Sequence, residues 1–138
     1  MPTPSELVER YVAMWNEGDS DARSAAVREL WAQDGAHVLQ PPREMLGEAA
    51  RIGFINPVLE ARGHLALEAR VTRAYEEFVG SGEFRFRSRN DAVQIGDVIK
   101  FGWEMVPAAG GDIAAAGLEF VVMDTQGRIR CDYQFIER

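Results

Sequence analysis

The sequence predicts a single α+β domain in which helices cover one face of a curved antiparallel sheet. Three segments before residue 80 carry apolar residues at helical spacing, whereas the chain from residue 83 onward alternates apolar and polar residues with a period of two. A length of 138 residues is typical of one domain with one core. No repeat or linker interrupts the sequence, and one domain over residues 1–138 is expected.

Capping residues and glycines predict where the helices begin and end. Thr3-Pro4-Ser5-Glu6 offers a capping threonine, a proline at the first helical position and a glutamate three residues after the cap, and Gly18 ends this helix. A second helix is expected from Asp19 or Ser20 to Asp34-Gly35, paired with the first. A third is expected from Gly63-His64 to Val79, because one side of it is apolar and the other charged.

A short strand at 36–40 is expected to end at Pro41-Pro42, since proline cannot donate to a strand ladder. The following stretch, 41–62, has the character of an insertion with a helical turn or two. Long connections in compact domains are often functional. We therefore expect this stretch to act as a lid over a cavity, using its apolar residues Met45, Leu46, Ile52, Phe54 and Ile55.

The second half of the chain predicts a meander of four strands. One strand begins after Glu83, one begins after Gly96, and two lie at 113–123 and 128–137. Simple alternation directs one set of side chains of the last strand toward the core: Ile129, Cys131, Tyr133 and Phe135. The same rule directs Asp132 and Gln134 outward.

Bulk properties exclude several classes of function. The formal net charge of −7 disfavours binding to nucleic acid or to anionic lipid, which would need a basic surface. No apolar run approaches the roughly 20 residues of a membrane span, and the first residues lack a secretory pattern. A cytoplasmic protein is expected by default. The single cysteine, Cys131, has no internal disulfide partner and is interpreted as a buried, inert thiol.

Three sequence stretches resemble the nuclear transport factor 2-like superfamily, which includes SnoaL-like and ketosteroid isomerase-like proteins. They are RYVAMWNEGD at 10–19, LWAQDGAHV at 30–38 and DTQGRI at 124–129. The resemblance implies a cone-shaped, cystatin-like fold with three N-terminal helices packed on the curved antiparallel sheet. It also implies an apolar pocket and a homodimer formed through the outer face of the sheet. It does not fix an activity, since the superfamily contains isomerases, cyclases, hydrolases and proteins that only bind.

The resemblance assigns roles to three positions. Tyr11 matches the tyrosine that stabilises an oxyanion in ketosteroid isomerases, although it could also be a packed helix residue. The proton-shuttling carboxylate of those enzymes corresponds to Gln40, and their second acid to Ala116. An amide and a methyl group cannot exchange protons at neutral pH. Ketosteroid isomerisation itself is therefore not expected.

Glu119 is the remaining candidate acid, because it is the only acidic residue in the apolar run 114–123. If it faces the pocket, burial raises its pKa into a useful range; if it faces outward, it is a solvated or interface charge. His37 is expected on the surface or at an interface, since alternation sets Val38 and Gln40 on the pocket side. The two histidines lie far apart with no acid at ligand spacing, and no metal is expected. No glycine-rich cofactor fingerprint is present, and no cofactor is expected.

The predicted site combines Tyr11 and Glu119 as catalytic residues with four substrate-binding residues: Trp15, Gln40, Trp103 and Tyr133. The expected ligand is a hydrophobic small molecule, polyketide-like or steroid-like, and the expected reaction is an isomerisation, cyclisation or hydrolysis. The alternative is a noncatalytic homodimeric domain whose interior only binds a ligand or is filled by side chains. A cavity that brings polar groups together would favour the enzyme.

Overall fold

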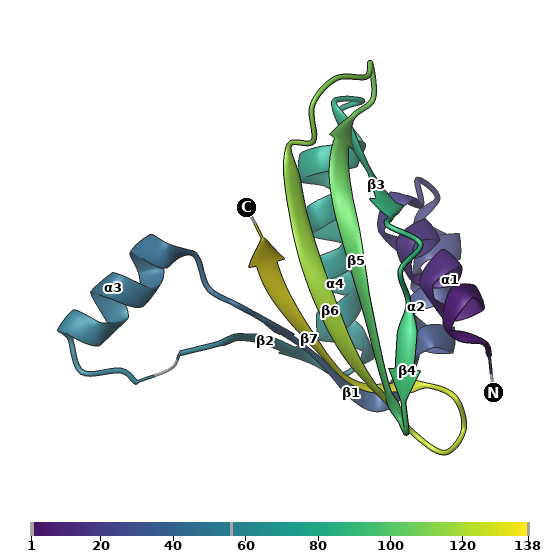
Figure 1. The fold of residues 1–138 in the computed structure, drawn as a ribbon, viewed down its shortest axis with the longest axis horizontal. Helices are drawn as coiled ribbons and strands as arrows, with labels where there is room; N and C mark the ends of the chain where they lie inside the picture. The colour runs from purple at the N-terminus through teal and green to yellow at the C-terminus, as the bar shows by residue number, and fades with distance from the viewer. Residues whose placement is uncertain (1, 56, 138) are drawn as a thin grey trace.

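A computed structural model describes residues 2–55 and 57–137 as helices packed on one sheet (Figure 1). The helices are α1 (Pro4–Asn16), α2 (Ser20–Leu30), α3 (Arg43–Arg51) and α4 (His64–Ala74), which continues into a π-helical turn at Tyr75–Val79. The strands are β1 (Trp31–Leu39), β2 (Leu59–Arg62), β3 (Phe84–Ser88), β4 (Val93–Ile95), β5 (Val98–Pro107), β6 (Ala115–Met123) and β7 (Ile129–Glu137).

The predicted capping groups start the first two helices. The Thr3 hydroxyl accepts from the Glu6 N–H at 3.2 Å, and the Asp19 carboxylate accepts from the Ala22 N–H at 2.8 Å. The predicted end of the second helix is wrong by about one turn. The chain leaves α2 after Leu30 and enters β1 directly, because the buried Trp31 pairs with Ile129 of the sheet.

The sheet has the order β2-β1-β7-β6-β5-β3, with β4 pairing along β5. The strand pairings among the described residues are antiparallel except that of β1 with β7, which is parallel. The prediction of a purely antiparallel sheet is therefore wrong at this pair. Residues 40–128 separate the two strands, and such a long connection allows them to run in the same direction.

Helices α1, α2 and α4 cover one face of the curved sheet, and Figure 1 shows them together behind and beside the long strands. Their buried side chains meet those of β5, β6 and β7 in one core that includes Leu7, Leu67, Phe101 and Ile129. Asn16 ties the end of α1 to β3, because its side chain both donates to the Phe86 carbonyl and accepts from the Phe86 N–H. No helix of the described residues is long and apolar enough to cross a membrane.

The stretch 41–62 forms an arm. Figure 1 shows α3 at its tip, away from the sheet, and β2 returning beside β1. The strand β2 was not predicted. No residue of α3 is buried, and the apolar residues Met45, Ile52, Phe54 and Ile55 are exposed. Pro41 and, within α3, Leu46 line a cavity of the domain.

An irregularity in β7 reverses the predicted faces of this strand. Ile129 pairs with Met123 and Cys131 pairs with Val122, so that Arg130 is an extra residue, a β-bulge. The alternation restarts after it. Asp132 consequently faces the core and Tyr133 faces outward, where Phe135 is also exposed. The predicted inward positions of Tyr133 and Phe135 are wrong for this reason.

A Gly35→Ala substitution is expected to destabilise the fold by about 1–3 kcal/mol. An added Cβ would lie 2.7 Å from the Trp31 ring, 2.8 Å from the Ile129 carbonyl and 3.0 Å from that of Ala32, two of which are backbone atoms. Urea denaturation measures the change. Gly47→Ala in α3 is the matched control, because nothing lies within 4 Å of the added atom. Equal stability of both variants would contradict the close approach at Gly35.

Candidate functional site

A cavity of about 730 Å³ lies between the helical layer and the sheet. Its wall is mainly apolar and aromatic, with contributions from Trp15, Phe78, Phe86 and Trp103. Polar groups line it in only a few places, among them Tyr11, His37 and Gln134. A volume and composition of this kind are typical of small-molecule sites.

The Tyr11 hydroxyl joins two buried carboxyl groups. It lies 2.8 Å from Glu119 Oε1 and 2.6 Å from Asp132 Oδ2, and both acids are completely inaccessible to solvent. The second oxygen of Glu119 accepts a hydrogen bond from the Trp103 indole at 2.8 Å. Tyr11, His37 and Trp103 line the cavity, whereas the two carboxyl groups lie directly behind them.

Hydrogen counting shows that one carboxyl group is protonated. A phenol has one hydrogen to donate, yet the Tyr11 oxygen lies within hydrogen-bond distance of two acids. Glu119 receives donors on both oxygens, which suits a carboxylate. Asp132 leaves its Oδ1 without a partner among the described residues, which is less costly for a neutral acid than for an ion. Asp132 therefore donates to Tyr11, and Tyr11 donates to Glu119.

Burial determines the acidity of this cluster. Desolvation raises the pKa of Glu119 to about 7, against the opposing effect of the hydrogen bonds that it accepts. Desolvation and the neighbouring Glu119 charge raise the pKa of Asp132 well above its usual range. Burial and the two acids likewise raise the pKa of Tyr11. Glu119 is thus the member of the cluster that changes charge near neutral pH.

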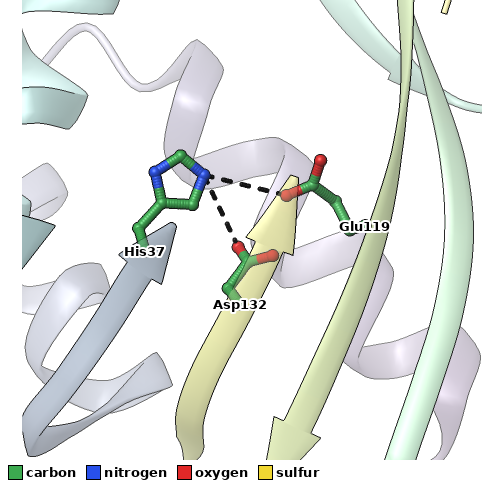
Figure 2. Close-up of side chains that lie close together, drawn as sticks. All are labelled: His37, Glu119 and Asp132. Atoms are coloured by element: carbon green, nitrogen blue, oxygen red, sulfur yellow. Dashed lines mark ion pairs between the residues drawn. The ribbon is translucent and has the colours of Figure 1, made fainter. Parts of the chain in front are cut away.

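His37 lies in the interior, and its predicted surface position is wrong. Figure 2 shows its ring beside the two acids, with Nε2 at 3.8 Å from Glu119 Oε1 and 3.9 Å from Asp132 Oδ2. Its nitrogens have other partners: Nε2 lies 2.9 Å from Gln134 Oε1, and Nδ1 lies 3.0 Å from Arg70 Nη1. An arginine only donates, so Nδ1 accepts and Nε2 carries the hydrogen. Burial lowers the pKa of His37, in agreement with a neutral ring.

His37, Glu119 and Asp132 place three ligand-type atoms within 4.8 Å of one another. Their hydrogen bonds do not fit a metal ion. A metal-bound histidine donates its other ring N–H to an acceptor. Here the nitrogen facing the acids is Nε2, and a hydrogen moved from it to Nδ1 would oppose the Arg70 guanidinium. The cluster therefore suits proton transfer better than metal binding.

No protein-family model and no curated protein matches the sequence. A SnoaL-like protein from Agrobacterium tumefaciens has a TM-score of 0.77 with 23% identity over 98% of this chain and 97% of that chain. A SnoaL-like protein of unknown function from Burkholderia thailandensis has a TM-score of 0.61 with 13% identity over 99% and 100% of the two chains.

A third similar structure, of unknown function and described as NTF2-like, comes from Mesorhizobium loti. Its TM-score is 0.58 with 16% identity over 100% of this chain and 97% of that chain. The chain has the nuclear transport factor 2-like fold. Other similar structures are described as cystatin-like, which agrees with the predicted α+β architecture.

Within this nuclear transport factor 2-like fold, five predicted site residues lie at the cavity or its floor. Tyr11 and Glu119 meet there, and Trp15 and Trp103 line the wall. Gln40 also lines the cavity, at its rim, where its side chain accepts from the Ile136 N–H. Tyr133 lies outside, on the opposite face of the sheet, and its assignment to the site is wrong.

The sequence reasoning missed the second acid of the site. Ala116, interpreted as its replacement, lies on the face of β6 opposite to Ala115, which lines the cavity. Asp132 on the neighbouring strand occupies the place beside Tyr11. Gly117 was a usable signal: a Cβ there would lie 2.4 Å from the Trp103 ring, so glycine allows the indole to reach Glu119.

Glu119 is expected to make the protein less stable as the pH rises from about 4.5 to 7. Its pKa is higher in the folded chain, which holds the proton over this range while the unfolded chain releases it. The free energy of unfolding is expected to fall by an amount on the order of 3 kcal/mol over this range. Glu119→Gln should remove this contribution and make the variant more stable than the wild type at pH 8. Urea denaturation at several pH values measures the difference, and parallel curves for both proteins would contradict it.

Proposed function

We propose that this protein binds an apolar small molecule in the cavity and catalyses a proton transfer on it. The observation that carries the proposal is the Tyr11 hydroxyl, which lines the cavity and bridges two buried carboxyl groups. Groups that exchange protons near neutral pH are what general acid–base catalysis needs, and Glu119 has a pKa of about 7.

A purely structural role explains this cluster poorly. Two buried acids without a cation as hydrogen-bond partner destabilise a fold, and apolar side chains of similar size would pack there at lower cost. Trp103, Tyr11 and Phe101 already supply a large apolar surface around Glu119. Perturbed acids beside a cavity are more typical of functional sites than of cores.

The hydrogen bonds support a relay. The substrate contacts the Tyr11 oxygen, which takes up the substrate's proton while its own hydrogen moves to Glu119 Oε1. Tyrosinate does not accumulate, because the pKa of Tyr11 is raised. Asp132 remains a neutral donor to the same oxygen and stabilises the charge that develops there. The reverse transfer returns the proton to another atom of the substrate, which completes an isomerisation.

Such a transfer also serves cyclisation or hydrolysis of a polyketide-like or steroid-like molecule. The similar protein from Agrobacterium tumefaciens is described as a candidate isomerase, which supports the isomerase class among these. A ketosteroid isomerase mechanism with a shuttle at position 40 is not proposed, since the Gln40 amide at the rim cannot exchange a proton.

Deuterium exchange tests the proposal without knowledge of the net reaction. The protein is incubated in deuterated water with a panel of apolar ketones, esters and keto acids, and deuterium incorporation is followed by mass spectrometry. Incorporation is expected for at least one class. Tyr11→Phe and Glu119→Gln should each lower the rate by about 100-fold or more, because each breaks the relay.

Tyr133→Phe is the matched control, since it removes a tyrosine hydroxyl on the outer face and should leave the exchange rate unchanged. Exchange that persists in Tyr11→Phe would refute the relay. Absence of exchange across the whole panel, in a protein that binds members of it, would refute catalysis of proton transfer and favour a binding protein.

We also propose that the arm at 41–62 closes over the cavity as a lid. The arm lines the cavity through Pro41, Pro42 and Leu46 of α3, and it carries exposed apolar residues such as Phe54. An isolated helix of nine residues is marginal in water, and α3 gains stability by covering an apolar ligand.

A noncatalytic homodimer is the second candidate function. One observation favours it: Phe120 and Phe135 stack edge to face on the outer side of the sheet with ring centroids 5.5 Å apart, and Tyr133 is exposed beside them. Exposed aromatic clusters often mark interfaces.

Light scattering after size-exclusion chromatography tests the dimer. A mass of twice 15.4 kDa is expected, falling to one chain in Phe135→Glu, because a charge at the centre of an apolar interface is desolvated without a partner. Ile95→Glu, at the exposed end of β4, is the control for the added charge. A monomeric wild type would contradict the dimer.

A further inference from the structure

Arg70 of α4 is a cation held in place at the cavity wall. Among the described residues, its three hydrogen bonds all leave from Nη1: to the His37 carbonyl at 3.0 Å, to His37 Nδ1 at 3.0 Å and to the Leu59 carbonyl at 3.2 Å. These bonds fix the guanidinium plane against the hairpin of β1 and β2. They involve neither Nε nor Nη2, which remain available on the same edge of the group.

No carboxylate in the described ranges, 2–55 and 57–137, forms an ion pair with Arg70. The acid whose charge it senses is Glu60, which is engaged by Arg62. Glu77, the acidic residue at the cavity wall, pairs with Arg73 at 3.9 Å. Burial lowers the pKa of Arg70, which marks the cost of leaving this cation half-buried.

The lining of the cavity therefore carries a net positive charge. Among the described residues, three arginines line it, Arg43, Arg70 and Arg73, against one acid, Glu77. The chain as a whole carries a formal charge of −7. A positive wall on an acidic protein favours an anion in the cavity, and the remaining aromatic wall suits an apolar body.

We propose that the ligand of this cavity is an apolar small molecule with a carboxylate, which pairs with Nε and Nη2 of Arg70. The two parallel N–H groups of one guanidinium edge match the two oxygens of a planar carboxylate. One fixed arginine also suits a monoanion better than a phosphate monoester, which carries more charge and more acceptor oxygens. This inference rests on the proposed use of the cavity for binding.

The position of Arg70 gives the carboxylate an orienting role. Arg70 contacts one side of the His37 ring, and Glu119 and Asp132 lie on the other side, beyond Nε2. The neutral His37 ring therefore lies between a carboxylate bound at Arg70 and the two acids. The apolar body then extends across the cavity toward the Tyr11 hydroxyl, where the proton transfer takes place.

Displacement of the neutral fluorescent probe N-phenylnaphthylamine from the cavity tests this assignment. Three competitors share one alkyl chain: dodecanoate, dodecanol and dodecyl phosphate. The wild type should bind dodecanoate at least about 10-fold more tightly than dodecanol, as charge-assisted hydrogen bonds imply. Arg70→Met should bring this ratio close to one, and Arg70→Lys should retain part of it.

Arg28→Met is the matched control, because Arg28 is an exposed arginine of α2 that pairs with Glu68 outside the cavity lining. It should keep the full preference. Circular dichroism checks that Arg70→Met is folded. If Arg70→Met does not fold, two measurements replace it: the reduced preference for dodecanoate in Arg70→Lys, and the loss of this preference in the wild type at high salt.

Several results would overturn the assignment. Equal affinity of the wild type for dodecanoate and dodecanol would refute an anion site, and tighter binding of dodecyl phosphate would refute the carboxylate. An equal loss of preference in Arg28→Met would show a nonspecific charge effect. Failure of every competitor and of the probe to bind would refute the cavity's binding role as well. A retained preference without deuterium exchange would refute the proton transfer alone.

Discussion

The candidate site depends on the burial of Glu119 and Asp132 on either side of one tyrosine hydroxyl. Two buried carboxyl groups that both contact one phenol oxygen are not both ionised. The Tyr11 oxygen accepts from the neutral Asp132 while its own hydrogen is donated to Glu119. The arrangement requires α1 to lie at a fixed height above the sheet. Asn16 supplies this constraint through its two hydrogen bonds with the Phe86 backbone.

Irregularities in the sheet bring the polar groups together. The extra residue in β7 turns Asp132 and Gln134 inward, and the parallel pairing of β1 places His37 directly opposite Asp132. Bulges commonly lie next to functional sites because they redirect side chains without lengthening a strand by much. The same bulge leaves Tyr133 outside, where it joins the aromatic residues of the outer face.

Much of the frame could be predicted from the sequence, because caps and periodicity act locally. The Thr3 cap and the helical repeat predict α1 and place Tyr11 on its apolar side. Glu119 could be identified because it is the one acid in an apolar run. Asp132 and His37 could not be placed in this way. Alternation counted without the bulge directs Asp132 outward, and alternation counted from Val38 and Gln40 directs His37 outward. The partners of His37, Gln134 and Arg70, come from distant elements.

The neutrality of His37 connects the two charged parts of the cavity. If Arg70 contacted Glu119 directly, the ion pair would lower the pKa of that acid far below neutrality and end its usefulness in proton exchange. The imidazole separates them: Nδ1 accepts from Arg70, Nε2 donates to Gln134, and no proton remains to be gained without breaking one of these bonds. A half-buried cation and two buried acids can therefore lie on opposite sides of one neutral ring, and the cation does not lower the pKa of Glu119 by direct contact.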